Sequence, residues 1–171
     1  MIDKTGVCES YSESFALVAR FCGLNAIVET GTLEGGPHEW NRVNVDGDWY
    51  IVDVTNNDID EFSNTLLMES ENQVQGTLIP DGSAYLDNFS ASDDTNDYYY
   101  KNEKYAKSDD ELTQLIKDAS NDGKEITNIK VDYSLGYTED QLYSKIGELV
   151  KSGEADIRSA GYFNNTLALL K

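Results

Sequence analysis

Cysteine and histidine are scarce in this chain of 171 residues, which contains Cys8, Cys22 and a single histidine, His38. A structural zinc site usually takes three or four Cys, His or carboxylate ligands at short spacings. These three residues lie far apart in the sequence, so we expect no metal site and no cofactor. Two cysteines are also too few for a disulfide scaffold. Any chemistry that pairs a thiol with an imidazole must therefore use His38.

Basic residues are also few, because 13 Lys and Arg stand against 32 Asp and Glu, a formal net charge of −19. A chain this acidic repels nucleic acid phosphates and anionic membrane surfaces, so we expect neither as a partner. No run of about 18 apolar residues is present, so we expect no membrane insertion. No basic segment followed by an apolar stretch begins at Met1. A secreted or cell-surface location would therefore require a signal peptide upstream of this sequence.

The length fits one domain, or one domain with a small companion. We predict a core domain over residues 1–105 and a small α/β appendage over residues 106–171. Apolar residues at three- and four-residue spacings predict a helix over residues 8–22, and Gly23 provides its C-terminal stop. The face of this helix that we expect to be buried consists of Val7, Tyr11, Phe15, Val18 and Cys22.

The segment after this helix has the pattern of an antiparallel sheet. It predicts a strand over residues 26–32 and a loop over residues 33–37, which contains two glycines and a proline. Asp46-Gly47 is a strong signal for a two-residue hairpin turn, and it lies between predicted strands over residues 38–45 and 48–55.

The remainder of the chain predicts short elements first and then alternating strands and helices. Residues 56–97 are expected to form loops with short elements at their two apolar patches. Two capping-box patterns, Ser108 with Glu111 and Thr138 with Gln141, mark helix starts. The expected elements are a strand pair or extended segment 98–107, a helix 108–120, a strand 125–133, a helix 138–151 and a strand 166–170.

Cys8 lies in the first turn of the first predicted helix, on the face that we expect to be buried. A helix N-terminus carries partial positive charge, which favours thiolate over thiol, and a nucleophilic cysteine needs this setting. Cys22 lies at the other end of the helix, about 21 Å away along the axis, where the dipole disfavours a thiolate. The two cysteines cannot form a disulfide, and we interpret Cys22 as a small buried hydrophobic residue.

The Asp46-Gly47 turn also determines which residues of the predicted hairpin face each other. A two-residue turn sets Trp40 opposite Asp53. Because side chains alternate along a strand, His38 and Asp53 then project from the same face as diagonal neighbours, with Cβ atoms about 7 Å apart. An aspartate beside a histidine fixes the tautomer of the ring, so that His38 can act as a base toward Cys8. On this pattern alone, a surface hairpin with a hydrogen-bonded histidine remains the alternative.

Three motifs around these residues resemble those of the transglutaminase-like superfamily. They are GVCESY at residues 6–11, HEWNRV at residues 38–43 and DGDWYIVDVT at residues 46–55. The motifs occur in the order of the family's nucleophile, histidine and aspartate motifs. The resemblance implies a papain-like α+β fold, in which the nucleophile helix packs on an antiparallel sheet. It also implies that Cys8 is the nucleophile, His38 the general base and acid, and Asp53 the orienting residue, and we expect a bacterial member.

Members of this superfamily transfer acyl groups through a thioester, so the resemblance implies thiol-dependent acyl transfer or amide hydrolysis. The substrate implied is a protein or peptide, including cell-wall peptide. The alternative is a catalytically inactive binding or scaffold module, which the short segment before Cys8 favours because family members have further helices there. The acidic run over residues 53–61 lacks EF-hand spacing, and we interpret it as a solvated loop. Residues from Ser108 onward contain no cysteine or histidine, and we expect them to lie outside the site.

Overall fold

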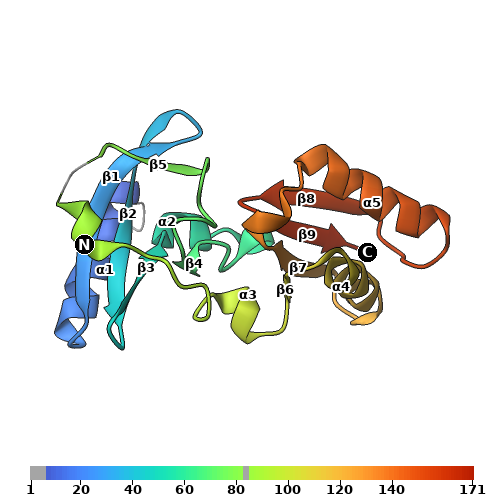
Figure 1. Cartoon of the computed structure of the whole chain (residues 1–171), viewed down its shortest axis with the longest axis horizontal. Coiled ribbons are helices and arrows are strands. Elements are labelled where there is room, and N and C mark those ends of the chain that lie inside the picture. The colour runs from blue at the N-terminus through green and yellow to red at the C-terminus, as the bar shows by residue number, and fades with distance from the viewer. Residues whose placement is uncertain (1–6, 83–84) are drawn as a thin grey trace, which may run out of the picture. The chain divides into compact units, whose positions relative to one another are not determined.

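The computed structural model describes residues 7–82 and 85–171 of the chain (Figure 1). The chain forms two compact units: Met1–Ile59 with Leu66–Tyr98, and Asp60–Thr65 with Tyr99–Lys171. Each unit has a sheet of its own. The first unit ends at Tyr98, before the boundary at residue 105 that the sequence predicts, and the short segment Asp60–Thr65 packs with the second unit.

The sheet of the first unit has five antiparallel strands in the order β4-β3-β2-β1-β5. The strands are β1 Asn25–Leu33, β2 Gly36–Val45, β3 Asp48–Val52, β4 Leu67–Glu69 and β5 Leu78–Pro80. The predicted loop over residues 33–37 is mostly strand. Only Glu34 and Gly35 turn the chain, with φ values of 50° and 80°, so β1 and β2 pair up to the turn.

Helix α1 spans Cys8–Phe21 and packs on one face of this sheet. The predicted helix is confirmed, but the face predicted to be buried is only partly correct: Phe15 packs against the core, whereas Val7 and Val18 are exposed. The buried residues are the small Ser12, Ala16 and Ala19, whereas Val18 is 60% exposed. Small side chains let the helix axis approach the sheet closely, while Leu17, Val18 and Phe21 point outward. Cys22 is exposed as well, so its interpretation as a buried residue is wrong.

The β2–β3 hairpin has the predicted register over Asn41–Val45 and Asp48–Val52. The turn residues Asp46 and Gly47 have φ values of 56° and 104°, as a two-residue hairpin turn requires. Strand β3 is shorter than predicted, because it stops at Val52. Asp53 instead caps a short helix, α2 (Val54–Asn57), by accepting a hydrogen bond from its backbone. The predicted strand pairing of Asp53 therefore does not form, although its side chain keeps its direction.

The second unit has a four-stranded sheet in the order β6-β7-β9-β8, in which only the β6–β7 pair is parallel. The strands are β6 Tyr105–Ala106, β7 Ile126–Val131, β8 Ser159–Phe163 and β9 Thr166–Leu170. Its longer helices are α4 Asp109–Asn121 and α5 Glu139–Lys151. The shorter helices of the chain are η1 Asp60–Phe62, η2 Leu86–Phe89, α3 Tyr98–Lys101 and η3 Tyr133–Leu135.

The capping patterns of the second unit predict its helices well. The Ser108 side chain accepts a hydrogen bond from the backbone N–H of Glu111, and Thr138 and Gln141 form a complete capping box. The segment 98–107 contains helix α3 as well as strand β6, so it is extended only in part, and strand β8 was not predicted. The buried side chains of α4 and α5 form one core with those of β7 and β9.

The predicted α+β class is confirmed, because the first unit is a helix packed on an antiparallel sheet and the second combines helices with a mixed sheet. Among the described residues, no helix has both the length and the apolar character needed to cross a membrane.

Candidate active site

Cys8 is the first residue of α1 and is partly exposed. The residue before it, Val7, is extended, and no side chain of the described residues caps this helix end. The first backbone N–H groups of α1 are therefore not used by a side-chain acceptor. Such groups, with the helix dipole, favour negative charge at this position.

His38 and Asp53 lie together as the hairpin register predicts. The distance between His38 Nε2 and Asp53 Oδ2 is 2.7 Å. The His38 side chain is 8% exposed and the Asp53 side chain 0%. A hydrogen bond that involves an ionised group in such a buried setting is stronger than one in water.

Asn56, in α2, donates two hydrogen bonds to the Asp53 carboxylate. Its backbone N–H donates to Asp53 Oδ1 at 3.2 Å, and its side-chain Nδ2 donates to Asp53 Oδ2 at 2.6 Å. Because the carboxylate only accepts, the hydrogen shared with His38 resides on Nε2. The other ring nitrogen, Nδ1, then has the lone pair that a general base needs. The sequence analysis missed Asn56, and its position three residues after the capping Asp53 is the signal that points to it.

Two contacts hold α1 alongside β2. Ser12 Oγ donates to Glu39 Oε2 at 3.0 Å, and Asn41 Nδ2 donates to the Ser12 carbonyl at 2.9 Å. Cys8 lies one helical turn before Ser12, about 6 Å along the axis, which corresponds to about two residues of a strand. Cys8 is therefore level with the beginning of β2, where His38 is located.

The thiol and the imidazole are not hydrogen bonded to each other within the described part of the chain. His38 alternates with Glu39 along β2, so its ring starts from the face opposite α1. A contact between Cys8 and His38 must therefore form around the end of the sheet, beyond the last residue of β3, and not across its face. Of the three predicted site residues, the structure brings His38 and Asp53 into contact and locates Cys8 at the same end of the sheet.

Tyr11 connects α1 to the segment after α2. Its hydroxyl donates to Asp58 Oδ2 at 3.0 Å, and this bond to a carboxylate raises the pKa of the Tyr11 phenol. Tyr11 therefore stays protonated and serves as a hydrogen-bond donor at neutral pH. Tyr11 is three residues after Cys8, and Asp58 is five residues after Asp53.

The first unit is thus an α+β domain, a helix packed on an antiparallel sheet, and this arrangement is consistent with a transglutaminase-like core. The family described as the transglutaminase-like superfamily matches residues 1–54, so the predicted resemblance is confirmed for that segment. The match contains Cys8, His38 and Asp53 and covers just under a third of the chain. No curated protein matches the chain.

Proposed function

We propose that the first unit catalyses thiol-dependent acyl transfer or amide hydrolysis on a protein or peptide, including cell-wall peptide. In this proposal Cys8 is the nucleophile, His38 the general base and acid, and Asp53 the residue that orients the ring. The observation that carries it is the buried 2.7 Å contact between His38 Nε2 and Asp53 Oδ2. That contact leaves Nδ1 as the proton acceptor, and the family match supports the thiol chemistry.

In the first half of the reaction, His38 Nδ1 accepts the proton of Cys8 Sγ, and the thiolate attacks the carbonyl carbon of the substrate amide. The C–N bond of the tetrahedral intermediate then breaks, and the proton on Nδ1 moves to the leaving amine. The product of this half is a thioester on Cys8. The first N–H groups of α1 are suited to hold the negative oxygen of the intermediate.

In the second half, water or an amine attacks the thioester carbon while His38 accepts its proton. The C–S bond breaks, and the proton returns to the sulfur of Cys8. Attack by water gives hydrolysis, and attack by an amine gives acyl transfer. The residues of the chain have the same roles in both cases.

The test is the pH dependence of alkylation by iodoacetamide in a Cys22→Ser variant, in which Cys8 is the remaining thiol. Cys22 is exposed and would otherwise react as an ordinary thiol. The proposal expects Cys8 to react well below pH 8, because a neighbouring imidazolium stabilises the thiolate. Adding His38→Gln should raise the reaction midpoint toward about 8.5, the value of a free cysteine.

A second candidate function is a non-catalytic binding or scaffold module with this fold. The observation that favours it is the absence of a hydrogen bond between Cys8 and His38 among the described residues. Reaction of Cys8 only near pH 8.5, unaffected by His38→Gln, would support this candidate and contradict the catalytic proposal.

A further inference from the structure

A cavity of about 760 Å³ lies on the face of the first unit's sheet that is opposite α1. Val43 and Val52 point toward α1, so the residues that alternate with them point into this cavity. The apolar part of its lining includes Trp40, Ile51 and Leu78. The volume is in the range of about 300–1,000 Å³ that is usual for binding sites of small ligands.

The cavity adjoins the candidate active site through Trp40. The rings of Trp40 and His38 are stacked, with centroids 6.1 Å apart and planes inclined by 27°. Gly31, which pairs with His38, leaves room for the indole: a Cβ there would lie 2.6 Å from Trp40 Cη2 and 2.2 Å from the Ile79 carbonyl oxygen. The Trp40 indole thus lines the cavity, and the ring stacked on it is that of His38, the proposed general base.

The charged lining of the cavity is mainly acidic. Arg42 donates through Nε and Nη2 to Glu29, and through Nη1 to Glu71 and to the Phe89 carbonyl. Four of the five N–H groups of this guanidinium are therefore engaged by the protein. Arg42 is ion-paired with both Glu29 and Glu71, and its single positive charge balances only one of the three carboxylates Glu29, Glu71 and Asp87, so the lining keeps an excess of negative charge.

The charge of the whole first unit has the same sign. Within Met1–Ile59 and Leu66–Tyr98 there are three Lys and Arg against 17 Asp and Glu, a formal charge of −14 out of −19 for the chain. An anionic ligand would be repelled by this field, and a cationic one attracted to it. The cavity therefore combines an apolar wall with a field that selects for cations.

We infer that this cavity binds a lysine or arginine side chain of a peptide substrate. The aliphatic stem of that side chain lies against Ile79 and Leu86, which keep exposed apolar surface in the lining, and its cationic head lies near Glu71 and Asp87. A long side chain with a charged tip is suited to a cavity that is apolar along its wall and acidic at its edge. This inference rests on the proposed function, since it gives the reaction a basic residue near the amide that is attacked.

Binding to the Cys8→Ala variant of the 171-residue chain tests the inference without any catalysis. The probe is the peptide acetyl-Ala-Lys-Ala-amide, compared with the same peptide containing norleucine or glutamate in place of lysine. The readout is the NMR signal of the indole N–H of Trp40, which donates to Glu29 at 2.7 Å inside the cavity. A Trp49→Phe variant assigns this signal, because the chain has two tryptophans.

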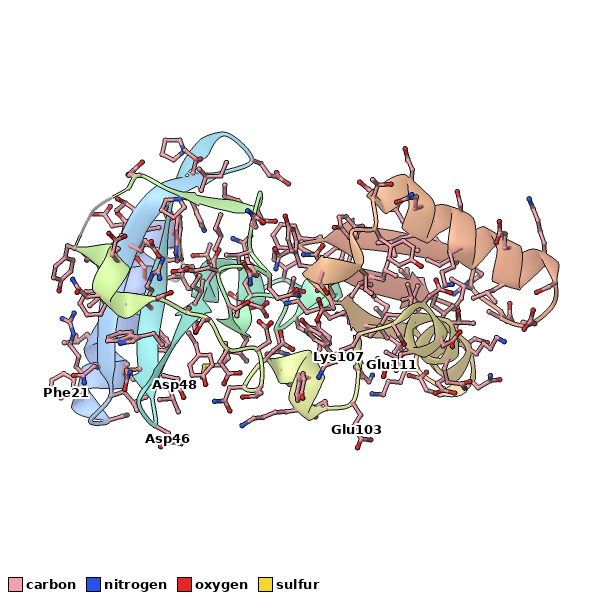
Figure 2. All side chains as sticks on the ribbon, viewed as in Figure 1. Phe21, Asp46, Asp48, Glu103, Lys107 and Glu111 are labelled. Carbon is pink, nitrogen blue, oxygen red and sulfur yellow. The ribbon has the colours of Figure 1, made fainter. Side chains whose placement is uncertain are left out.

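The lysine peptide should shift the Trp40 signal in a saturable way, the norleucine peptide should bind roughly fivefold more weakly, and the glutamate peptide should cause no shift. Asp87→Asn should weaken binding of the lysine peptide about two- to fivefold. The matched control is Asp46→Asn, which removes the same charge at the tip of the β2–β3 hairpin, outside the cavity lining (Figure 2). This control should have little effect at physiological salt, because solvent screens distant charges.

Equal binding of the lysine and norleucine peptides would overturn the inference. Equal losses in Asp87→Asn and Asp46→Asn would also overturn it, since they would assign binding to the general charge of the unit. A peptide that binds as expected but is not converted by the unmodified chain would count against the proposed function alone. A chain that is active but does not bind the lysine peptide in the cavity would count against this inference alone.

Discussion

Asp53 is the residue on which the local organisation of the site depends, because it has two structural roles. Its Oδ1 accepts the hydrogen bond that caps α2, and its Oδ2 accepts from His38 Nε2. A fully buried carboxylate is stable only where hydrogen bonds replace its water. The donors from Asn56 and His38 supply these bonds, so the cap of the helix and the orientation of the ring depend on the same side chain.

Asn56→Ala should reduce the alkylation rate of Cys8 at pH 7 by about tenfold. Losing a residue that orients a site residue through a hydrogen bond often has an effect of this size. The variant removes the 2.6 Å hydrogen bond to Asp53 Oδ2. In the Cys22→Ser background, the pH profile of alkylation should move toward that of an ordinary cysteine.

The neighbouring amide offers a matched control. Asn57 forms two hydrogen bonds with the backbone of Leu66, away from the imidazole. Asn57→Ala should lower the free energy of unfolding by about 1–2 kcal/mol and leave the pH profile unchanged. An Asn56→Ala profile identical to that of the unmodified chain would show that this residue has no part in thiol activation.

Among the secondary-structure elements, the pairing of α1 with β2 decides where Cys8 lies. Ser12 is the contact point, since both Glu39 and Asn41 are hydrogen bonded to it. The small residues of α1 allow this close approach, and its large residues Val18 and Phe21 point away from the core, 60% and 84% exposed. The position of the thiol thus depends on polar contacts between a helix and a strand as well as on apolar packing.

Asn41→Ala should lower the free energy of unfolding by about 2 kcal/mol, measured by urea denaturation. The buried amide donates to the Ser12 and Ile27 carbonyls at 2.9 and 3.2 Å, so the variant loses both bonds and leaves a small void. Asn44→Ala, further along β2, is the control, and it should change stability by less than about 0.5 kcal/mol. Equal effects of the two variants would mean that the hydrogen bonds of the Asn41 amide contribute nothing to stability.

At the scale of the whole molecule, the two units differ in net charge, and the chain passes from the first unit to the second and back before it enters the second unit again. The first unit has a formal charge of −14, while the second contains ten of the 13 basic residues. The segment Asp60–Thr65 belongs to the second unit, where Phe62 packs against Phe163 with ring centroids 5.9 Å apart. Lys117, Lys145 and Lys171 form ion pairs with carboxylates of the same unit, and these pairs couple its stability to pH.

Asp122 provides the clearest case of such coupling. Burial by itself raises the pKa of this carboxyl group, but hydrogen bonds from Lys171, Thr127 and the backbone of Lys124 bring the pKa well below its usual range. A group with a lowered pKa in the folded state stabilises the fold above its unfolded value of about 3.9, and this contribution is lost as the pH falls below that value.

Asp122→Asn should therefore lower the free energy of unfolding by about 1–2 kcal/mol at pH 7. The difference from the unmodified chain should shrink as the pH falls from about 4 toward 2. Denaturation curves at several pH values measure it, with Asp156→Asn as an exposed control that should shift stability by less than about 0.5 kcal/mol. A difference of constant size from pH 7 to pH 2 would contradict the role of the charged carboxylate.

Local chemistry in the sequence is sufficient to predict several features of this protein. Asp46-Gly47 sets the hairpin register, and alternation along the strands then brings His38 and Asp53 to one face. The capping residues Ser108 and Thr138 locate the starts of α4 and α5. These features depend on interactions over a few residues, so a single sequence contains the information needed to predict them.

Other features depend on contacts between distant segments and are decided only in three dimensions. Which face of α1 is buried depends on how closely the sheet approaches, and this favours Ser12 over the larger Val18. Asn56 joins the site because β3 stops at Val52 and Asp53 caps α2. The cavity beside Trp40 requires residues from β1, β2 and the segment after β4 to meet. Packing and burial are properties of the assembled fold, which is why the local pattern of the sequence does not contain them.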